Sequence, residues 1–318
     1  MSTNTNRTNY VCNLDAAQRH QLYRILRHKG WTLDRVEHSE WRARQEKTTV
    51  VAYESGKVVI QGKGTPELVR YTLEPEILKE ARFGYEDVHL KQESPEMFEP
   101  HAGVDEAGKG DYFGPLVIVA VYVDPDSAHA LARLQVADSK SIKSDKRVCE
   151  FAEQIRETLG QNYDCIPIGP EAYNRNYEKM GNVNRLLAWG HARALENLLE
   201  KVPECPRAVA DQFATASTLR NALLTRGQRI ELTQVPRAEA DIAVAAASIL
   251  ARAEFVERLK KLGERAGVTL PKGAGPGVDK VASQIMADQG EHQLAKFAKM
   301  HFRTTEKVRS RLHRTEGQ

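Results

Sequence analysis

The chain has 318 residues, of which 41% are hydrophobic and 28% charged, and its net charge is +3. This balance is typical of a globular protein with one large domain and one small one. The longest apolar run, Leu116 to Val123, is too short to span a membrane, and the polar N-terminus has no signal-peptide core. The four cysteines contain no Cys-x-x-Cys pair, which argues against a zinc site or a disulfide framework. We therefore expect a reduced, cytoplasmic protein with no membrane partner.

The first 75 residues, 1–75, are predicted to form a small α+β domain. Apolar residues at helical spacing predict an amphipathic helix over 14–28. Strand-like runs follow within 41–53 and at 58–60, joined by a Ser-Gly-Lys turn. A second helix is predicted over 65–73, with a proline in its first turn.

Residues 76–99 are predicted to be an acidic linker with a short helix inside it. Over residues 100–318 strands alternate with helices, which is typical of an α/β domain. The predicted strands are 104–107, 116–123, 208–211 and 230–235, and the predicted helices are 144–159, 186–199, 218–225 and 242–262.

The charges are unevenly spread along the chain. Lys and Arg outnumber Asp and Glu by 12 to 7 in residues 1–73 and by 14 to 8 in residues 251–318, whereas residues 100–250 hold 17 basic against 20 acidic residues. Basic flanks suit a polyanionic partner, and an acidic centre suits bound divalent cations. Chance unevenness on solvated surfaces is an equal alternative.

The segment from Gly103 to Pro115 carries the strongest functional signal. Its first part fits most of the phosphate-binding pattern Gly-x-x-x-x-Gly-Lys. We reject that interpretation because Gly110 replaces the required Ser or Thr, and because Asp105 and Glu106 would repel a triphosphate. In addition, a strand follows where a helix N-terminus is needed.

Asp105 and Glu106 are instead predicted to lie at the end of a strand that leads into a glycine loop. Adjacent residues of a regular strand point to opposite faces. Both carboxylates can therefore reach one metal site only if the strand ends or bulges at Glu106. Gly108 and Gly110 favour such a break. The alternative is an exposed acidic hairpin.

Three further carboxylates are candidates for the same site. Asp211 ends the predicted strand 208–211, where burial without a cation or hydrogen-bond partners is unfavourable, although it could equally cap a helix. Glu239 and Asp241 directly precede the helix that begins at Ile242, and either could be only a helix cap. The alanine and serine stripe of that helix permits close packing, which would bring its N-terminus up to the sheet.

Clustered carboxylates are hard oxygen ligands, which select Mg²⁺ or Mn²⁺. Two such ions about 3.5–4 Å apart can activate water and stabilise the leaving 3′ oxygen in phosphodiester cleavage. The sequence holds no competing Cys or His cluster and no Gly-x-Ser-x-Gly elbow of a serine hydrolase.

The run Asp105-Glu106 followed by Gly108 to Pro115 resembles the signature of bacterial ribonuclease HIII, a type 2 ribonuclease H. Residues 9–75 resemble more weakly the N-terminal domain of that family, which is similar to TATA-box-binding protein and binds the hybrid. Further matching segments follow in order: Asp138-Ser139-Lys140, Tyr173-Asn174, Asn182 to His191, Asp211-Gln212-Phe213, Ala243 to Ser248, Leu270 to Ala274, and His301-Phe302.

This resemblance implies a ribonuclease H-like fold with a central mixed sheet. It implies an endoribonuclease that hydrolyses the RNA strand of RNA–DNA hybrids, leaving 5′-phosphate and 3′-hydroxyl ends. It also implies that Asp105, Glu106 and Asp211 bind the metal. Glu239 aligns with the family's fourth carboxylate, but the spacing to the following helix is one residue short, so Asp241 stays open as the alternative.

The resemblance further implies a set of substrate-binding residues. Gly108, Lys109 and Gly110 match the loop that reads the ribose 2′-OH. Many relatives have Thr in place of Lys109, where a lysine could add a phosphate contact. The remaining candidates would contact backbone phosphates, and each also fits a plain solvated surface: Ser139, Lys140, Lys143 and Lys272, with Lys57 and Lys63 in the N-terminal domain.

His191 and His301 also fall in matching segments. For His191, which shares a helix with Trp189, packing is favoured over catalysis. His301 lies near a basic C-terminal stretch, predicted to be a solvated helix face that could also touch nucleic acid.

We expect the protein to be a monomer, and two other functions stay open. One is ribonuclease HII-like cleavage at single embedded ribonucleotides, against which the N-terminal domain and the Gly-Asp-Tyr-Phe-Gly-Pro run argue. The other is a catalytically silent hybrid-binding protein, against which the full set of candidate carboxylates argues.

Overall fold

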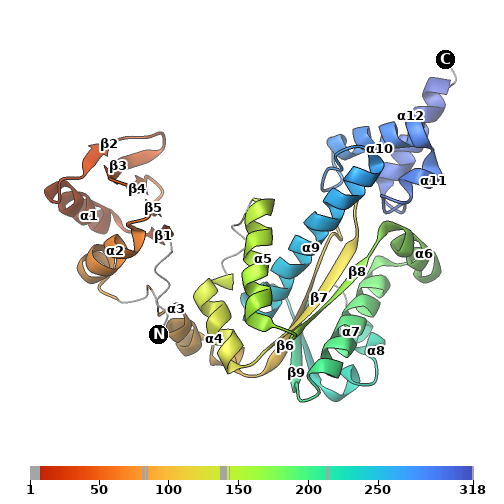
Figure 1. Cartoon of the computed structure of the whole chain (residues 1–318), viewed down its shortest axis with the longest axis horizontal. Helices are drawn as coiled ribbons and strands as arrows, with labels where there is room; N and C mark the ends of the chain where they lie inside the picture. The colour runs from red at the N-terminus through yellow and green to blue at the C-terminus, as the bar shows by residue number, and fades with distance from the viewer. Residues whose placement is uncertain are drawn as a thin grey trace. The chain divides into compact units, whose positions relative to one another are not determined.

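The computed structural model describes residues 8–80, 83, 85–136, 142, 144–212 and 215–316. The chain divides into two compact units, residues 1–92 and residues 93–318, and each is described by itself (Figure 1). Within the described ranges, no helix combines the length and the apolar character needed to cross a membrane.

The first unit is built on an antiparallel five-stranded sheet with the strand order β1-β5-β4-β3-β2. Its elements are β1 (Asn9–Asn13), α1 (Ala16–His28), β2 (Thr32–Asp34), β3 (Ser39–Gln45), β4 (Thr48–Tyr53), β5 (Lys57–Gly62), α2 (Thr65–Leu68) and the π-helix η1 (Val69–Leu78). The core includes alternate residues of two central strands and one face of α1: Val50, Ala52, Val58, Ile60, Leu22 and Leu26.

The helix predicted over 14–28 corresponds to α1. It begins at Asp15, whose side chain accepts a hydrogen bond from the backbone N–H of Gln18 at 2.8 Å. The Gln18 side chain in turn accepts one from the backbone N–H of Asp15 at 3.0 Å. The sequence pattern does not reveal β1 and β2, because both are short edge strands with few buried side chains.

The second unit is built on a five-stranded mixed sheet with the order β10-β9-β6-β7-β8, which confirms the predicted α/β class. Strand β9 is parallel to β6 and β10, whereas β7 is antiparallel to β6 and β8. The strands are β6 (His101–Ala107), β7 (Leu116–Val123), β8 (Tyr163–Ile168), β9 (Arg207–Asp211) and β10 (Glu231–Val235).

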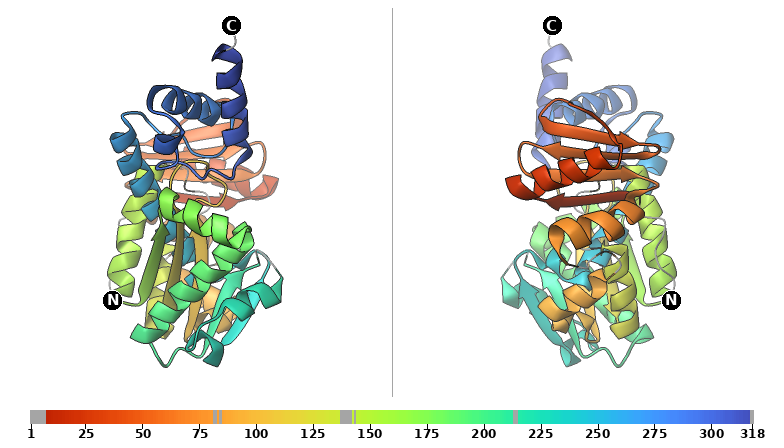
Figure 2. Two further views of the ribbon diagram at one scale, coloured as in Figure 1. Left: turned by 90° about the vertical axis from the view of Figure 1, so that its right-hand side faces the viewer. Right: turned by 90° about the vertical axis from the view of Figure 1, so that its left-hand side faces the viewer.

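Two short helices, α3 (Glu86–Glu93) and η2 (Pro95–Phe98), precede β6. The helices that follow are α4 (Pro125–Leu134), α5 (Asp145–Leu159), α6 (Pro170–Met180), α7 (Val183–Lys201), α8 (Ala216–Ala222), η4 (Gly227–Arg229), η5 (Ala238–Ala240), α9 (Ile242–Ala266), α10 (Pro276–Gln289), α11 (Glu291–Leu294) and α12 (Arg303–Glu316). Figure 2 shows α10, α11 and α12 gathered at one end of this unit, where α10 packs against the other two.

Helices cover both faces of the mixed sheet (Figure 1). Helix α9 packs on β6 and β7 with α5 beside it, and α7 packs on the opposite face next to α8. At Gly103 a Cβ atom would lie 2.2 Å from the backbone nitrogen of Val244, so only glycine lets α9 lie this close to β6. The close packing predicted from the small-residue stripe is confirmed, since Ala243 to Ala247 are all buried.

Candidate active site

The central strand β6 carries Asp105 and Glu106 near its C-terminal end. Its ladder with β7 is regular from His101 through Ala107, so the expected strand end or bulge at Glu106 is wrong. The break comes later, at Gly108, where the backbone takes a φ of +87°. Because the strand is regular at both carboxylates, their side chains leave it on opposite faces.

Asp105 is a half-buried carboxylate on the face covered by α9. It accepts hydrogen bonds from the backbone N–H of Glu106 at 2.8 Å and from the side chain of Ser248 in α9. Burial, together with the negative charge of Glu106, raises the pKa of Asp105 to about 6. Among the residues that the structure describes, none forms an ion pair with Asp105, and only the charge of His191 acts to lower its pKa from a distance.

Glu106 lies on the other face, where His191 of α7 holds it. The Nε2 atom of His191 lies 3.0 Å from Oε2 of Glu106, and the histidine side chain is fully buried. Burial acts to raise the pKa of Glu106, but the hydrogen bond and charge of His191, aided by Lys109, outweigh it and lower that pKa. The packing role favoured for His191 is therefore incomplete, because its ring also orients a candidate ligand.

Asp211 ends β9, the strand beside β6. The parallel ladder pairs Gly103 with Val209 and Val104 with Ala210. The ladder ends there, and the next residues of the two strands are Asp105 and Asp211. Asp211 lies two residues after Val209, which packs against Val244 of α9, so both carboxylates leave their strands on the α9 side.

Glu239 lies close in sequence to a contact of Asp211. It sits in η5 directly after Ala238, whose backbone N–H donates to Oδ1 of Asp211 at 3.3 Å. The chain therefore carries Glu239 toward the strand end at which Asp211 lies.

Asp241 is drawn to a different place. It caps α9 by accepting hydrogen bonds from the backbone N–H groups of Ala243 at 2.9 Å and Val244 at 3.1 Å. Its Oδ2 atom lies 2.9 Å from Nε2 of the buried His101. His101 begins β6, so in an extended strand it lies about 13 Å from Asp105. The structure therefore gives Asp241 a helix-capping role and does not bring it to Asp105.

The oxygen donors at this strand end include the carboxylates of Asp105 and Asp211. Among the described residues, no three His, Cys, Asp or Glu side chains are gathered closely enough to form a ready-made metal site. The donor chemistry still fits a hard divalent cation. Asp105 and Asp211 directly follow the last paired residues of two adjacent strands, and no residue that the structure describes forms an ion pair with the half-buried Asp105.

A glycine loop joins β6 to β7 beside these carboxylates. A Cβ atom at Gly108 would lie 2.2 Å from the carbonyl oxygen of Pro115, so glycine is required there, whereas the space around Gly110 is open. The Nζ atom of Lys109 lies 3.9 Å from Oε1 of Glu106. The loop thus places backbone groups and one lysine next to the carboxylates.

A buried lysine that the sequence patterns missed fixes the far end of the loop. Lys299 is fully buried, and its Nζ atom donates hydrogen bonds to the carbonyl oxygens of Asp111 and Gly114, each at 2.8 Å. The same atom lies 5.6 Å from the centre of the Tyr173 ring. Burial lowers the pKa of Lys299 to about 7. Its one sequence signal is a lysine within the short segment 297–300, whose other members are apolar.

The predicted phosphate-binding residues lie in different parts of the chain. Lys272 forms an ion pair with Asp145 at the start of α5. Lys57 begins β5 of the first unit and Lys63 directly follows that strand. Three further candidates lie outside the described residues: Ser139, Lys140 and Lys143.

Comparisons with known proteins show the family of this chain. A family model described as ribonuclease HII matches residues 102–305, and a second, described as "Domain of unknown function (DUF3378)", matches residues 9–81. Ribonuclease HIII of Chlamydia pneumoniae is 41% identical over 303 residues, which cover 94% of this chain and 97% of that protein. The chain belongs to the ribonuclease HIII family.

Other members of the ribonuclease HIII family agree with this assignment. Ribonuclease HIII of Protochlamydia amoebophila is 36% identical over 299 residues, which cover 94% of this chain and 96% of that protein. The crystal structure of Bst-RNase HIII in complex with Mn²⁺ has a TM-score of 0.62 at 29% identity, covering 95% of this chain and 98% of that one. The predicted resemblance and the ribonuclease H-like fold are thereby confirmed.

Proposed function

We propose that this protein is an endoribonuclease that hydrolyses the RNA strand of RNA–DNA hybrids with Mg²⁺ or Mn²⁺, leaving 5′-phosphate and 3′-hydroxyl ends. The observation that carries the proposal is the placement of Asp105 and Asp211 at adjacent strand ends, next to a glycine loop, in a chain of the ribonuclease HIII family. Support for the metal comes from a relative, Bst-RNase HIII, which was crystallised with Mn²⁺.

The proposed metal ligands are Asp105, Glu106 and Asp211. For Glu106, which leaves β6 on the opposite face from Asp105, the proposal rests on the family resemblance and not on the strand geometry. Glu239 is favoured over Asp241 as the fourth carboxylate, because Glu239 follows the backbone group that contacts Asp211, whereas Asp241 is engaged by His101. When bound, the divalent cations supply an activated water and stabilise charge on the leaving oxygen. The protein orients the carboxylates, because the Ser248 side chain hydrogen-bonds Asp105 and His191 hydrogen-bonds Glu106.

Substrate recognition is proposed to use backbone groups of the glycine loop. Gly108 and Gly110 would let main-chain groups approach a ribose 2′-OH, which distinguishes RNA from DNA, and Lys109 would add a phosphate contact. The lysines proposed to contact phosphates elsewhere are Lys140, Lys143 and Lys272, together with Ser139. Residues 1–75 would form a TATA-binding-protein-like substrate-binding domain with contacts from Lys57 and Lys63, followed by a linker over 76–99 and a catalytic domain over 100–318.

We also propose that the protein acts as a monomer in the cytoplasm. All four cysteines are free thiols in the structure, which is compatible with a reducing compartment. Sedimentation at micromolar concentration would measure the proposed state, and a stable dimer would contradict it.

The proposal is tested by cleavage of an RNA–DNA hybrid with Mg²⁺ or Mn²⁺, compared with single-stranded RNA, duplex RNA and duplex DNA. Asp105→Asn is expected to lower the cleavage rate by more than about 100-fold, because even outer partners of metal ligands change activity by about 10–100-fold. The matched control is Asp288→Asn, which alters an exposed carboxyl on α10.

Two outcomes would replace the proposal. Preference for a duplex with one embedded ribonucleotide over a long hybrid would favour ribonuclease HII-like cleavage. Tight binding of hybrid without cleavage, with either metal present, would show a silent binding protein.

A further inference from the structure

A cavity of about 460 Å³ lies among α6, α9 and the residues that follow α11. Among its described lining residues the one acid is Glu171. Five basic side chains line it, and we call it the cation-lined cavity: Arg175, Arg258, Lys261, Arg265 and Lys296.

Of these five basic side chains, only Arg258 forms an ion pair within the described part of the chain. Arg258 pairs with Glu254 at 2.5 Å. Within the described ranges, no carboxylate lies within 4.0 Å of the other four. Lys261 and Arg265 stand four residues apart on α9, where like charges repel and destabilise a helix. With a net charge of only +3 for the whole chain, this local excess does not follow from composition.

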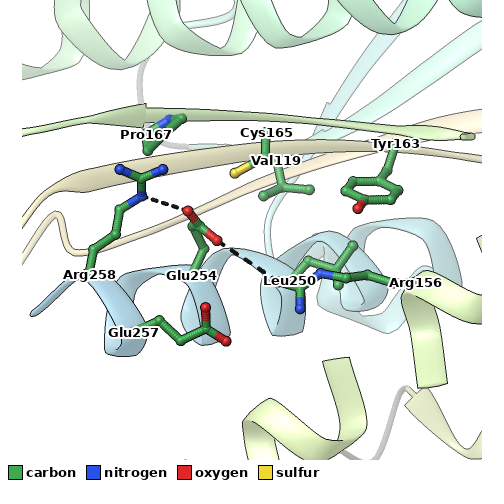
Figure 3. A pocket seen from close by; sticks show the side chains of 9 residues that line it. All are labelled: Val119, Arg156, Tyr163, Cys165, Pro167, Leu250, Glu254, Glu257 and Arg258. Carbon is green, nitrogen blue, oxygen red and sulfur yellow. Dashed lines mark hydrogen bonds and ion pairs between the residues drawn. The ribbon is translucent and has the colours of Figure 1, made fainter. Parts of the chain in front are cut away.

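A neighbouring hollow shows the opposite arrangement (Figure 3). It has a volume of about 280 Å³, and its charged side chains are two arginines and two glutamates. Its Glu254 contacts both arginines, Arg258 at 2.5 Å and Arg156 at 4.0 Å. The charges of this hollow balance one another, so it calls for no charged ligand, whereas the cation-lined cavity lacks such a balance.

We propose that the cation-lined cavity binds a phosphate group, carried either by a nucleic-acid strand or by a free small molecule. Arginine forks match phosphate oxygens in pairs, and lysines add point charges. The cavity falls in the range of about 300–1,000 Å³ found for small-ligand sites. Of the segment from Gly103 to Pro115, only Pro115 lines the cavity, so it is distinct from the candidate active site.

The first arm of the test uses inorganic phosphate as the probe, with chloride at equal ionic strength as the reference. Phosphate is expected to raise the melting temperature of the intact protein by at least about 2 °C. The double variant Lys261→Gln/Arg265→Gln should lose this rise. The control variant Lys260→Gln/Lys280→Gln should keep it, because it removes two exposed lysines that do not line the cavity.

The second arm measures binding of an RNA–DNA hybrid without divalent cations at several salt concentrations. If a strand supplies the phosphate, the slope of log affinity against log salt should become shallower by about one to two in the cavity variant and stay unchanged in the control. A lost phosphate rise with an unchanged slope assigns the site to a free phosphorylated molecule.

Two results would overturn the proposal. One is the absence of any phosphate effect in the intact protein together with an unchanged hybrid slope, and the other is an equal loss in the control variant. The strand arm rests on the proposed function. If the intact protein does not bind hybrid at all, that function fails while the phosphate arm still decides the cavity. Should the α9 variant misfold, Arg175→Gln/Lys296→Gln changes the other side of the cavity and gives the same readouts.

Discussion

Gly103→Ala should destabilise the second unit strongly. The added Cβ would lie 2.2 Å from the backbone nitrogen of Val244 and 2.4 Å from the carbonyl carbon of Ala243. Ordinary contact begins at 3.4 Å, so α9 would have to retreat from β6 by about 1.2 Å. Overpacking in a core costs about 1–3 kcal/mol, and a clash between two backbones belongs at the upper end. For a unit of this size, about 3 kcal/mol corresponds to a melting temperature lower by about 6–12 °C.

Alanine substitutions at two other glycines provide comparisons for this prediction. At Gly190 a Cβ would meet the end of the Ile118 side chain at 2.6 Å, which can move aside, so Gly190→Ala should lower the melting temperature less than Gly103→Ala does. At Gly277, near the start of α10, nothing lies within 4 Å, so Gly277→Ala should stabilise the protein by up to about 1 kcal/mol. Calorimetry of the three variants checks the order. A Gly103→Ala protein that melts within about 1 °C of the parent would refute the close approach of α9.

Three further predictions concern single side chains. Glu239→Gln should lower hybrid cleavage by more than about 100-fold. Asp241→Asn should keep most of the cleavage and lower the melting temperature, because it weakens only the helix cap and the His101 contact. If parallel assays gave the reverse pattern, Asp241 and not Glu239 would be the fourth carboxylate. Lys109→Ala should still cleave hybrid but flatten the salt dependence of hybrid binding by about one unit of slope, and an unchanged slope would remove its phosphate contact. The folded-state pKa of Lys299 is about 7 against an ordinary 10.5, so the unfolded state binds more protons between those values. The free energy of unfolding should therefore gain a rising contribution from pH 7 to 10.5. Urea titrations should show that Lys299→Met loses this contribution, and an unchanged pH dependence would contradict it.

Local sequence patterns predicted the elements whose structure is determined mainly by burial. The apolar run of β7 and the small-residue stripe of α9 are each visible in the sequence, because every residue of β7 is buried and α9 packs directly on β6. Strand β8 is hidden, since most of its side chains are half-buried and it contains Pro167. Its pairing with β7, rather than its composition, makes it a strand.

The candidate site residues can be selected from the sequence, but their arrangement in space cannot. Asp105, Glu106 and Asp211 stand out by type and spacing, yet their facing directions depend on a ladder with β7 that continues past Glu106. Nor does spacing decide between Glu239 and Asp241. The residue that engages Asp241 is His101, which lies 140 positions away in the sequence.

Strand β6 stands between two helical layers, and each layer grips one of its adjacent carboxylates, through Ser248 on one side and His191 on the other. The positions of the two carboxylates therefore depend on how closely the helices on the two faces pack against the sheet. On warming, small shifts of these helices should displace the carboxylates and lower the cleavage rate before any helix unfolds. Loss of turnover several degrees below the unfolding transition, reversible on cooling, would be the signature of such an enzyme.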